Sequence, residues 1–334
     1  MAVKTVFGAS PITNNLLQLV ETDLQQIEVE LKNVAQSALP LVDDINQYLH
    51  NSGGKRLRPA LLLLCSKLCG FEGDSAVRLG VVVELIHLAT LVHDDIIDNA
   101  EIRRGLPSVN SRWGNQTTVL MGDWLYTTSF NLALQVRDFR VLDVLIHITL
   151  KMVEGELMQL EDNCRTDTMA ERQLEVCLHK TAHLFSGCGR LGAILGQIVA
   201  HEEEKLALYG RSLGMAFQLV DDLLDYTSNV SDLGKPVLKD LEEGKLTLPI
   251  IYLMQRADRG ERSFVQEVIR NQDFSSENKK EIVRLVRLYG TLRDVRQLAE
   301  KHAVQARECL MGFPNSTYRE VLLEIPDFVV NRKH

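Results

Sequence analysis

The 334-residue sequence has few prolines, few cysteines and no excess of positive charge. None of its 8 prolines falls between Pro107 and Pro236. Such a span favours continuous helix, because an interior proline removes a backbone hydrogen bond and clashes with the preceding turn. The net charge of −8 argues against nucleic acid as a partner, since binding to a phosphate backbone depends on surplus lysine and arginine.

The 6 cysteines form no tight pairs of the kind that bind zinc, and they are too sparse for a disulfide scaffold. We therefore expect free thiols and a cytoplasmic location. The N-terminus lacks the apolar stretch of a secretion signal, and residues 1–10 are expected to form a loose segment. No apolar run reaches the roughly 18 uninterrupted residues of a membrane span, so we expect a soluble protein without a transmembrane segment.

Apolar residues recur at helical spacing almost throughout the chain, whereas the alternation typical of strands is rare. Segments rich in Gly, Pro, Asn or Ser interrupt this pattern at 51–59, 103–115, 163–168, 227–249 and 312–316. None has the length and low complexity of a flexible linker between domains. The sequence predicts an all-α protein with one large helical domain over residues 1–334.

Two acidic motifs stand on apolar backgrounds, LVHDDIID at 91–98 and LVDDLLD at 219–225. In each, aspartates at positions i and i+4 share one face of a helix near its predicted C-terminus. Three carboxylates this close repel one another unless a cation lies among them, and Mg²⁺ prefers oxygen ligands and substrate phosphates. A solvated helix face could explain one motif, but two near-identical motifs favour a metal site. The predicted magnesium ligands are Asp94, Asp95, Asp98, Asp221, Asp222 and Asp225.

Basic residues occur in the segments around these motifs. They are Lys55, Arg56 and Arg58 in GGKRLRP, Arg103 and Arg104 in RRG, Lys180 beside Thr181 in HKTAHLF, and Lys235 and Lys245 in GKPVLKDLEEGKLTLP. Each alone is more often a surface charge, but together with the aspartates they indicate a site for two diphosphates. His87 lies two turns before Asp94 on the same helix face, whereas His93 lies off that face and is interpreted as structural.

These motifs closely resemble those of the trans-isoprenyl diphosphate synthases, or polyprenyl synthetases. The matching segments are GGKRLRP, HLATLVHDDIIDNAEIRRGLPSVNSRWGN, KTAHLF, GMAFQLVDDLLDY and GKPVLKDLEEGKLTLP, in the family's order. The resemblance implies an isoprenoid synthase fold with helices around a deep central cavity, and a homodimer. It also implies Mg²⁺, three ions with substrate bound, and a head-to-tail trans condensation of isopentenyl diphosphate with an allylic diphosphate.

Matching each motif residue by residue gives the expected roles of the side chains. For isopentenyl diphosphate they are Lys55, Arg58, His87 and Arg104; for the allylic diphosphate and the developing cation they are Arg103, Lys180, Thr181, Gln218, Lys235 and Lys245. Those expected to act in catalysis are Asp94, Asp95, Asp98, Arg103, Lys180, Asp221, Asp222 and Lys235. One position departs from the family, which often has glycine where this chain has Leu238. The resemblance therefore does not establish the conformation of this loop at Leu238.

Product length should depend on residues before the first acidic motif, along the direction in which the growing tail extends. Ala89 and Thr90 lie five and four residues before Asp94, roughly 6–7.5 Å deeper along a helix. In the family, bulky aromatics here stop growth at short products, so these small residues predict a medium-to-long product, hexaprenyl to octaprenyl. The aromatic residues Trp124, Tyr126 and Phe130 could form a deeper floor, although such spacing is more often ordinary core.

Four alternatives remain at this point. A shorter-chain synthase of the geranylgeranyl or farnesyl type has the same motifs. A terpene cyclase shares the helical fold, but DDLLD differs from its usual second motif, and GGKRLRP implies a second diphosphate that a cyclase does not need. A di-iron bundle requires two Glu-x-x-His elements, and ELIH is the one present. An inactive partner subunit of an active synthase is disfavoured by the intact acidic motifs.

Overall fold

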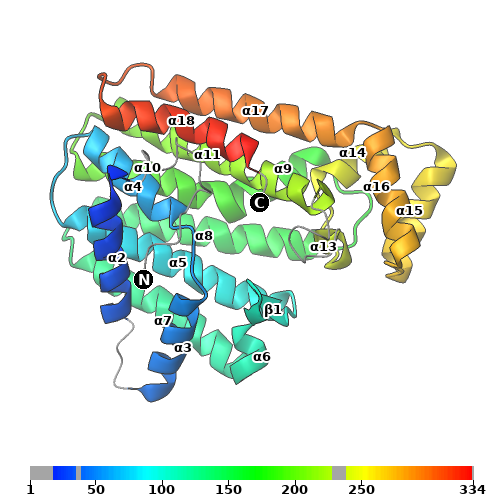
Figure 1. Ribbon diagram of the computed structural model, residues 1–334, viewed down its shortest axis with the longest axis horizontal. Helices are drawn as coiled ribbons and strands as arrows, with labels where there is room; N and C mark the ends of the chain where they lie inside the picture. Colours follow the sequence, from blue (N-terminus) through cyan, green and yellow to red (C-terminus); the bar gives the residue numbers. More distant parts are fainter. Residues whose placement is uncertain (1–17, 35–38, 228–237, 333–334) are drawn as a thin grey trace. The chain divides into compact units, whose positions relative to one another are not determined.

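The computed structural model of the protein describes residues 18–34, 39–227 and 238–332 (Figure 1). Within these residues it is almost entirely helical, and a hairpin of two short strands is the one sheet. The predicted all-α fold is thus confirmed. The expected loose segment 1–10 and Lys235 lie outside the described residues. Contacts between residues divide the chain into two compact units, which are described separately, and the single domain stays a prediction.

The first unit comprises Met1–Thr149, Gly187–Ala207 and Phe313–Leu322. Its own elements are α2 (Glu21–Val34), α3 (Pro40–Asn51), α4 (Leu57–Leu68), α5 (Ser75–Ile97), β1 (Ile102–Arg103), β2 (Leu106–Pro107), α6 (Val109–Trp113) and α7 (Asn115–Leu134). The antiparallel hairpin pairs Arg103 with Leu106, and Arg104 and Gly105 form its two-residue turn with positive φ angles of 53° and 78°. Positive φ at both turn residues matches the right-handed twist of paired strands.

The helix α5 forms the core of the first unit, where it packs against α2, α4 and α7 (Figure 1). Its residues from Leu79 to Ile86 are all buried, which explains why this segment is apolar on every side. By length and composition α5 could cross a membrane, but 67% of its most apolar window is buried inside the protein. Such burial is typical of a core helix.

The second unit comprises Leu150–Ser186, Leu208–Gly312 and Leu323–His334. Its own elements are α9 (Ala170–Cys177), the π-helix η1 (Leu178–Ala182), α13 (Lys239–Glu242), α14 (Leu248–Arg256), α15 (Arg259–Asn271), α16 (Ser276–Leu288) and α17 (Thr291–Cys309). The apolar helix α14 packs against α9, α15, α16 and α17. Side chains of Asp258 and Ser275 accept backbone N–H groups at the starts of α15 and α16, which fixes where these helices begin.

Four further helices contain residues of both units: α8 (Phe139–Asp162), α10 (His183–Leu195), α11 (Ala200–Thr227) and α18 (Thr317–Asn331). The predicted interruptions at 163–168 and 312–316 fall between helices, as expected. The interruption at 103–115 contains more structure than predicted, because Ser108 caps the short helix α6 by accepting the N–H of Ser111. Local capping of this kind is hard to recognise when the helix has only five residues.

Candidate active site

The segment GGKRLRP forms the turn between α3 and α4 in the first unit. Gly53 has a φ of +71°, a value that glycine adopts readily. Lys55 is exposed and Arg58 is half-buried in the first turn of α4. Arg56 is different, because its side chain is only 5% exposed and is paired with two glutamates. The structure therefore assigns different environments to the three basic residues of this motif.

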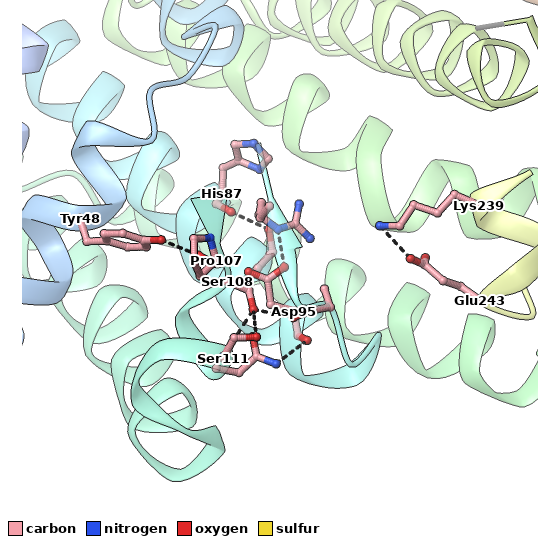
Figure 2. A network of polar contacts seen from close by, with 12 residues as sticks. Tyr48, His87, Asp95, Pro107, Ser108, Ser111, Lys239 and Glu243 are labelled. Carbon is pink, nitrogen blue, oxygen red and sulfur yellow. Dashed lines mark hydrogen bonds and ion pairs between the residues drawn. The ribbon is translucent and has the colours of Figure 1, made fainter. Parts of the chain in front are cut away.

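The first acidic motif lies at the C-terminal end of α5, as predicted. Asp94 and Asp98 are half-buried, with Asp98 at the helix C-cap. Asp95 is 2% exposed, and its carboxylate accepts a hydrogen bond from Nε of Arg103 in β1. The backbone oxygen of Asp95 accepts a second bond, at 3.2 Å, from Asn110 of α6. The hairpin and α6 thus attach to α5 at this aspartate (Figure 2).

Further hydrogen bonds fix the hairpin that carries Arg103 and Arg104. The Ser108 hydroxyl donates to the backbone oxygen of Ala100, and the Tyr48 hydroxyl donates to that of Pro107 at 2.6 Å (Figure 2). These bonds hold the base of the hairpin to α5 on one side and to α3 on the other. The two arginines are thereby presented on a short, well-anchored turn.

His87 lies on α5, two turns before Asp94 in the sequence. Figure 2 shows His87 near Asp95 of the same helix. Burial lowers its pKa well below the usual value, and the positive charges of four arginines lower it further, in decreasing order Arg58, Arg104, Arg103 and Arg56. The imidazole is therefore neutral at physiological pH and can donate one hydrogen bond to an anion. All four of these charges, from the GGKRLRP turn and from the hairpin, therefore act on one histidine. Of the residues predicted to bind isopentenyl diphosphate, Arg58 and Arg104 thus act on His87, and Lys55 is exposed in the same turn as Arg58. Their role in binding stays a prediction.

The residues expected to set product length lie on α5 as predicted. Ala89 is fully buried, and Thr90 is half-buried with its hydroxyl bonded to the backbone oxygen of His87 at 2.7 Å. His93 has the structural role expected of it. Its Nε2 lies 3.1 Å from the backbone oxygen of Val119, and a Cβ on Gly122 would lie 2.1 Å from the same nitrogen. His93 therefore joins α5 to α7.

The second acidic motif, in the second unit, lies near the C-terminal end of α11. Its three aspartates have different surroundings. Asp221 is exposed and pairs with Arg332 at 3.0 Å. Asp222 is 2% exposed, and burial together with the charge of Asp240 raises its pKa well above the usual value. Asp225 is half-buried, and burial raises its pKa to about 6 despite backbone N–H groups that stabilise its charge.

A chain of hydrogen bonds connects the π-helix η1 to the second motif. Thr181 donates its hydroxyl to Oε1 of Gln218 at 2.7 Å, and Nε2 of Gln218 donates to Oδ1 of Asp222 at 2.8 Å. Lys180 points to α8, where it pairs with Glu156 and donates to Gln159 at 2.6 Å. Thr181 of KTAHLF thus forms one network with Gln218 and Asp222 of GMAFQLVDDLLDY. Glu156 and Gln159 were not predicted.

The segment after the second motif is described from Leu238 onwards. Leu238 has a φ of +64° and is fully buried, so it adopts the left-handed conformation that glycine would take more readily. This observation answers the question that the substitution raised, since the turn forms with leucine. Lys245 is half-buried and pairs with Glu243 at 2.8 Å, and Glu243 also pairs with Lys239 at 3.0 Å (Figure 2).

The carboxylates suit a magnesium site, which needs few protein ligands, better than a site closed by protein ligands alone. In the ranges 18–34, 39–227 and 238–332, no group of three or more His, Cys, Asp or Glu side chains is arranged to hold a metal ion. Mg²⁺ needs no such group, because it usually takes one or two carboxylates and completes its shell with water and phosphate oxygens. Oδ2 of Asp222 is buried without a hydrogen-bond partner among the described residues, which a bound cation would satisfy. The ligand set stays a prediction.

Sequence reasoning missed several residues that shape the site. Arg332 follows Asp221 by 111 positions, and nothing in the sequence around Arg332 indicates that the two residues pair. Glu84 gave a usable signal, because a lone acidic residue inside the apolar run VVVELI needs a partner when buried. Glu28 on α2 gave no such signal, because it resembles the other acidic residues of its helix.

Comparisons with known proteins agree with this structure. The family model for polyprenyl synthetase matches residues 39–286. The octaprenyl diphosphate synthase of Haemophilus influenzae is 33% identical over 321 residues, which cover 96% of this chain and 97% of that protein. A short chain isoprenyl diphosphate synthase of Methanothermobacter thermautotrophicus is 34% identical over 293 residues, covering 86% and 90% of the two chains.

A solved structure, the polyprenyl synthase of Caulobacter crescentus complexed with calcium and isoprenyl diphosphate, superposes with a TM-score of 0.92. It is 32% identical and the match covers 96% of this chain and 98% of that one. The motifs, the fold and these matches agree over nearly the full length. The chain therefore belongs to the polyprenyl synthetase family of Mg²⁺-dependent prenyltransferases and has the all-α isoprenoid synthase fold.

Proposed function

We propose that this protein joins isopentenyl diphosphate head-to-tail to an allylic diphosphate and forms a trans-polyprenyl diphosphate. The observation that carries the proposal is that Arg103, on a hairpin bonded to Asp95 of the first acidic motif, and its neighbour Arg104 act electrostatically, together with Arg58 of α4, on His87 of α5. Such a cluster of guanidinium groups suits a diphosphate, which accepts paired hydrogen bonds from arginine. The adjacent acidic motif would be repelled by a diphosphate unless cations joined the two.

In this proposal, isopentenyl diphosphate is bound by Lys55, Arg58, His87 and Arg104. Arginine and lysine charges neutralise its diphosphate, and the neutral imidazole of His87 contributes a hydrogen bond without adding a further positive charge. The Tyr48–Pro107 hydrogen bond and the Ser108–Ala100 bond keep the hairpin turn at Arg104 in place. A fixed turn favours catalysis because orienting two substrates removes much of the entropic barrier to their reaction.

The allylic diphosphate is assigned to Arg103, Lys180, Thr181, Gln218, Lys235 and Lys245. Asp95 orients Arg103 through its bond to Nε, and Glu156 and Gln159 orient Lys180. The aspartates of both motifs would hold Mg²⁺, three ions with substrate bound as the family resemblance implies. When bound, Mg²⁺ neutralises the charge that grows on the departing diphosphate.

The reaction breaks the allylic C–O bond, whose electron pair leaves with the diphosphate. The double bond of isopentenyl diphosphate then attacks the allylic cation, and loss of a proton restores a double bond in the product. We assign no protein side chain as the base, and the released diphosphate takes this proton in the proposal. In this proposal the hydrogen-bonded side chains of Thr181 and Gln218 supply neutral dipoles, which would stabilise the cation without trapping it.

The proposed product is medium to long, hexaprenyl to octaprenyl. Its support is the small size of Ala89 and Thr90 on α5, together with the octaprenyl product in the name of the Haemophilus influenzae relative. The Methanothermobacter thermautotrophicus relative is a short-chain enzyme, so a geranylgeranyl or farnesyl product is the alternative. Chromatography of the products separates the two, because products no longer than twenty carbons would contradict the proposal.

The test of the reaction uses purified protein with Mg²⁺, farnesyl diphosphate and radiolabelled isopentenyl diphosphate. We expect labelled polyprenyl products, and we expect their loss with EDTA or in the variants Asp94→Ala and Asp221→Ala. A wild-type protein that is folded but makes no product would contradict the proposal. Should it then restore activity to a separate active chain, it would be a partner subunit.

We further propose a homodimer in the reducing cytoplasm. Leu150, Val153, Leu157 and Leu160 are exposed at helical spacing along α8, a row of apolar side chains that a second copy would cover. All 6 cysteines are free thiols, which suits a reducing compartment. Light scattering should give a dimer mass for the wild type and a monomer for Leu157→Glu. A monomeric wild type would contradict the dimer.

A further inference from the structure

Arg56 stands among the basic residues of GGKRLRP, but its side chain is directed into the first unit. Its Nη1 donates to Oε1 of Glu84 on α5 at 2.6 Å. Its Nε and Nη2 donate to the two carboxylate oxygens of Glu28 on α2, the latter bond at 3.3 Å. Three of the five guanidinium donors are therefore engaged by carboxylates. A guanidinium held in this way joins α2, α5 and the turn before α4.

The backbone of the turn depends on this pairing. Arg56 is the N-cap of α4 and has a φ of 47° and a ψ of 28°, a left-handed conformation that is unfavourable for a residue with a Cβ. The guanidinium of Arg56 lies over Gly54, where a side chain would leave it no room. A Cβ there would lie 2.4 Å from Nη1 of Arg56 and 3.4 Å from Oε1 of Glu84. The second glycine of the motif and Arg56 thus form one structural unit.

The charges around Arg56 favour a permanent ion pair. The Glu28 pKa is lowered, because the bonds from Arg56 outweigh the opposing effect of burial. His50 of α3 lies 3.0 Å from the same carboxylate, and burial lowers its pKa, so it adds no charge at neutral pH. Glu84 is 4% exposed, and without the guanidinium its buried, unpaired charge would strongly destabilise the folded protein. The pair is therefore fully formed at the pH at which the enzyme would work.

The residues on either side of Arg56 are the ones assigned to isopentenyl diphosphate. Lys55 precedes it and Arg58 follows it by two positions, where the charge of Arg58 acts on His87. Any displacement of the turn at Arg56 would move both groups relative to His87, which is fixed on α5. Arg56 is thus one position from Lys55 and two positions from Arg58, so its ion pair can fix the backbone that carries both.

We propose that Arg56, paired with Glu28 and Glu84, is a positioning residue that holds Lys55 and Arg58 in place for isopentenyl diphosphate and does not bind the diphosphate itself. The inference rests on the proposed function. It gives a role to Arg56, the basic residue of GGKRLRP to which the family resemblance assigns none. It also gives Glu28, which is far from every motif in the sequence, a part in substrate binding.

The test compares three variants by isothermal titration with isopentenyl diphosphate alone, which is not consumed without an allylic partner. The key variant is Glu28→Gln, which leaves Arg56 in place but removes one of its two charge partners. We expect binding to weaken by about tenfold, the effect of losing one charge-assisted contact. Arg56→Met should weaken binding further, and Arg56→Lys should fall between the two because it keeps one ion pair.

Steady-state kinetics gives a second measurement. The KM for isopentenyl diphosphate should rise in the same order, whereas the KM for farnesyl diphosphate and kcat at saturating substrate should stay within about twofold of wild type. The matched control is Asp23→Asn, which removes another ion pair of α2 with α4, to Lys67 at 2.8 Å. The two mutated carboxylates have similar side-chain exposure, 28% for Asp23 and 23% for Glu28, and the control should leave both KM values unchanged.

The outcomes separate the alternatives. If Arg56 contacted the diphosphate directly, Glu28→Gln would leave binding unchanged or strengthen it, because the guanidinium would gain freedom and net positive charge. Either result overturns the inference, as does an equal rise in both KM values. A wild-type enzyme that binds no isopentenyl diphosphate would instead refute the proposed function. Thermal unfolding of each variant shows that the measured protein is folded.

Discussion

The Asp225 carboxylate accepts the backbone N–H of Lys239 at 2.9 Å. It also accepts that of Asp240 at 3.3 Å, and the Asp225 backbone oxygen accepts the N–H of Leu238 at 3.1 Å. The last aspartate of the second motif therefore fixes the turn that starts α13. Asp221, the first aspartate of the same motif, is exposed and contacts Arg332. Two aspartates of one motif thus make different contacts, Asp225 with the backbone of a turn and Asp221 with a side chain.

Asp225 should matter for stability and Asp221 for activity. Replacing Asp225 by alanine leaves two backbone N–H groups without their acceptor, and we expect the free energy of unfolding to fall by about 1–2 kcal/mol. Asp221→Ala removes the exposed carboxylate that pairs with Arg332, whose side chain is only 7% exposed. Because Arg332 keeps its hydrogen bond to the backbone oxygen of Phe217 at 2.8 Å, we expect a smaller loss of stability than for Asp225→Ala, yet a fall in kcat of at least a hundredfold. Urea unfolding in EDTA and steady-state assays in Mg²⁺ measure the two effects. An equally destabilised Asp221→Ala would contradict this division.

The pKa of Asp240 predicts how stability changes with pH. Burial and the neighbouring charge of Asp225 raise it from 3.8 to about 7. Between these values the folded protein retains a proton that the unfolded chain has released, so metal-free protein loses stability as the pH rises from about 4 to about 7. The variant Asp240→Asn has no such proton. Its urea midpoint in EDTA should exceed that of wild type at pH 8 and approach it below pH 4, and parallel curves would contradict the assignment.

Leucine at position 238 allows a direct test of backbone strain. Loss of this fully buried side chain should cost about 2–5 kcal/mol, and relief of its left-handed conformation should return about 1–2 kcal/mol. Burial is the larger effect, so Leu238→Gly should destabilise the protein. At an ordinary helical position glycine is worse than alanine by about 1 kcal/mol. Here Leu238→Gly should be at least as stable as Leu238→Ala in urea unfolding, and the reverse order would argue against strain.

The sequence predicted the parts of the site that depend on local spacing. Asp94 and Asp98 share a face of α5 because residues four apart always do so on a helix, and His93 lies off that face for the same reason. The left-handed turn at Leu238 could not be predicted, because leucine adopts this conformation only where the surrounding tertiary structure stabilises it.

Pairings between distant residues were beyond the reach of the sequence. Glu28 and Arg56 are 28 positions apart, and Asp221 and Arg332 are 111 apart. Any of the 45 acidic residues could in principle pair with any of the 37 basic ones. The π-helix η1 was also missed, because one extra residue in a helical turn leaves the apolar periodicity almost unchanged. These features decide how Lys180 and Arg56 are oriented.

Gly155 on α8 should be necessary for the position of Lys180. A Cβ at Gly155 would lie 2.8 Å from the backbone nitrogen of Lys180, so alanine would push η1 away from α8. Because Lys180 then loses its alignment with Glu156, we expect kcat to fall by about tenfold or more. The control is Gly260→Ala in α15, where the nearest atom would lie 3.4 Å away. Unchanged activity in Gly155→Ala would contradict the proposed orientation of Lys180.

Ala89 should limit how far the product can grow if the tail follows α5. Phenylalanine at this buried position adds a ring about 7.5 Å along the helix from Asp94, where a chain of a few isoprene units would meet it. We expect Ala89→Phe to shift the products to twenty carbons or fewer while the first condensation continues. Thr90→Val keeps the volume and removes only the hydroxyl bonded to His87, so its product distribution should match that of wild type. Chromatography of radiolabelled products measures both variants, with unfolding curves to show that the added ring is tolerated. Wild-type product lengths from a folded, active Ala89→Phe enzyme would place the growing tail elsewhere.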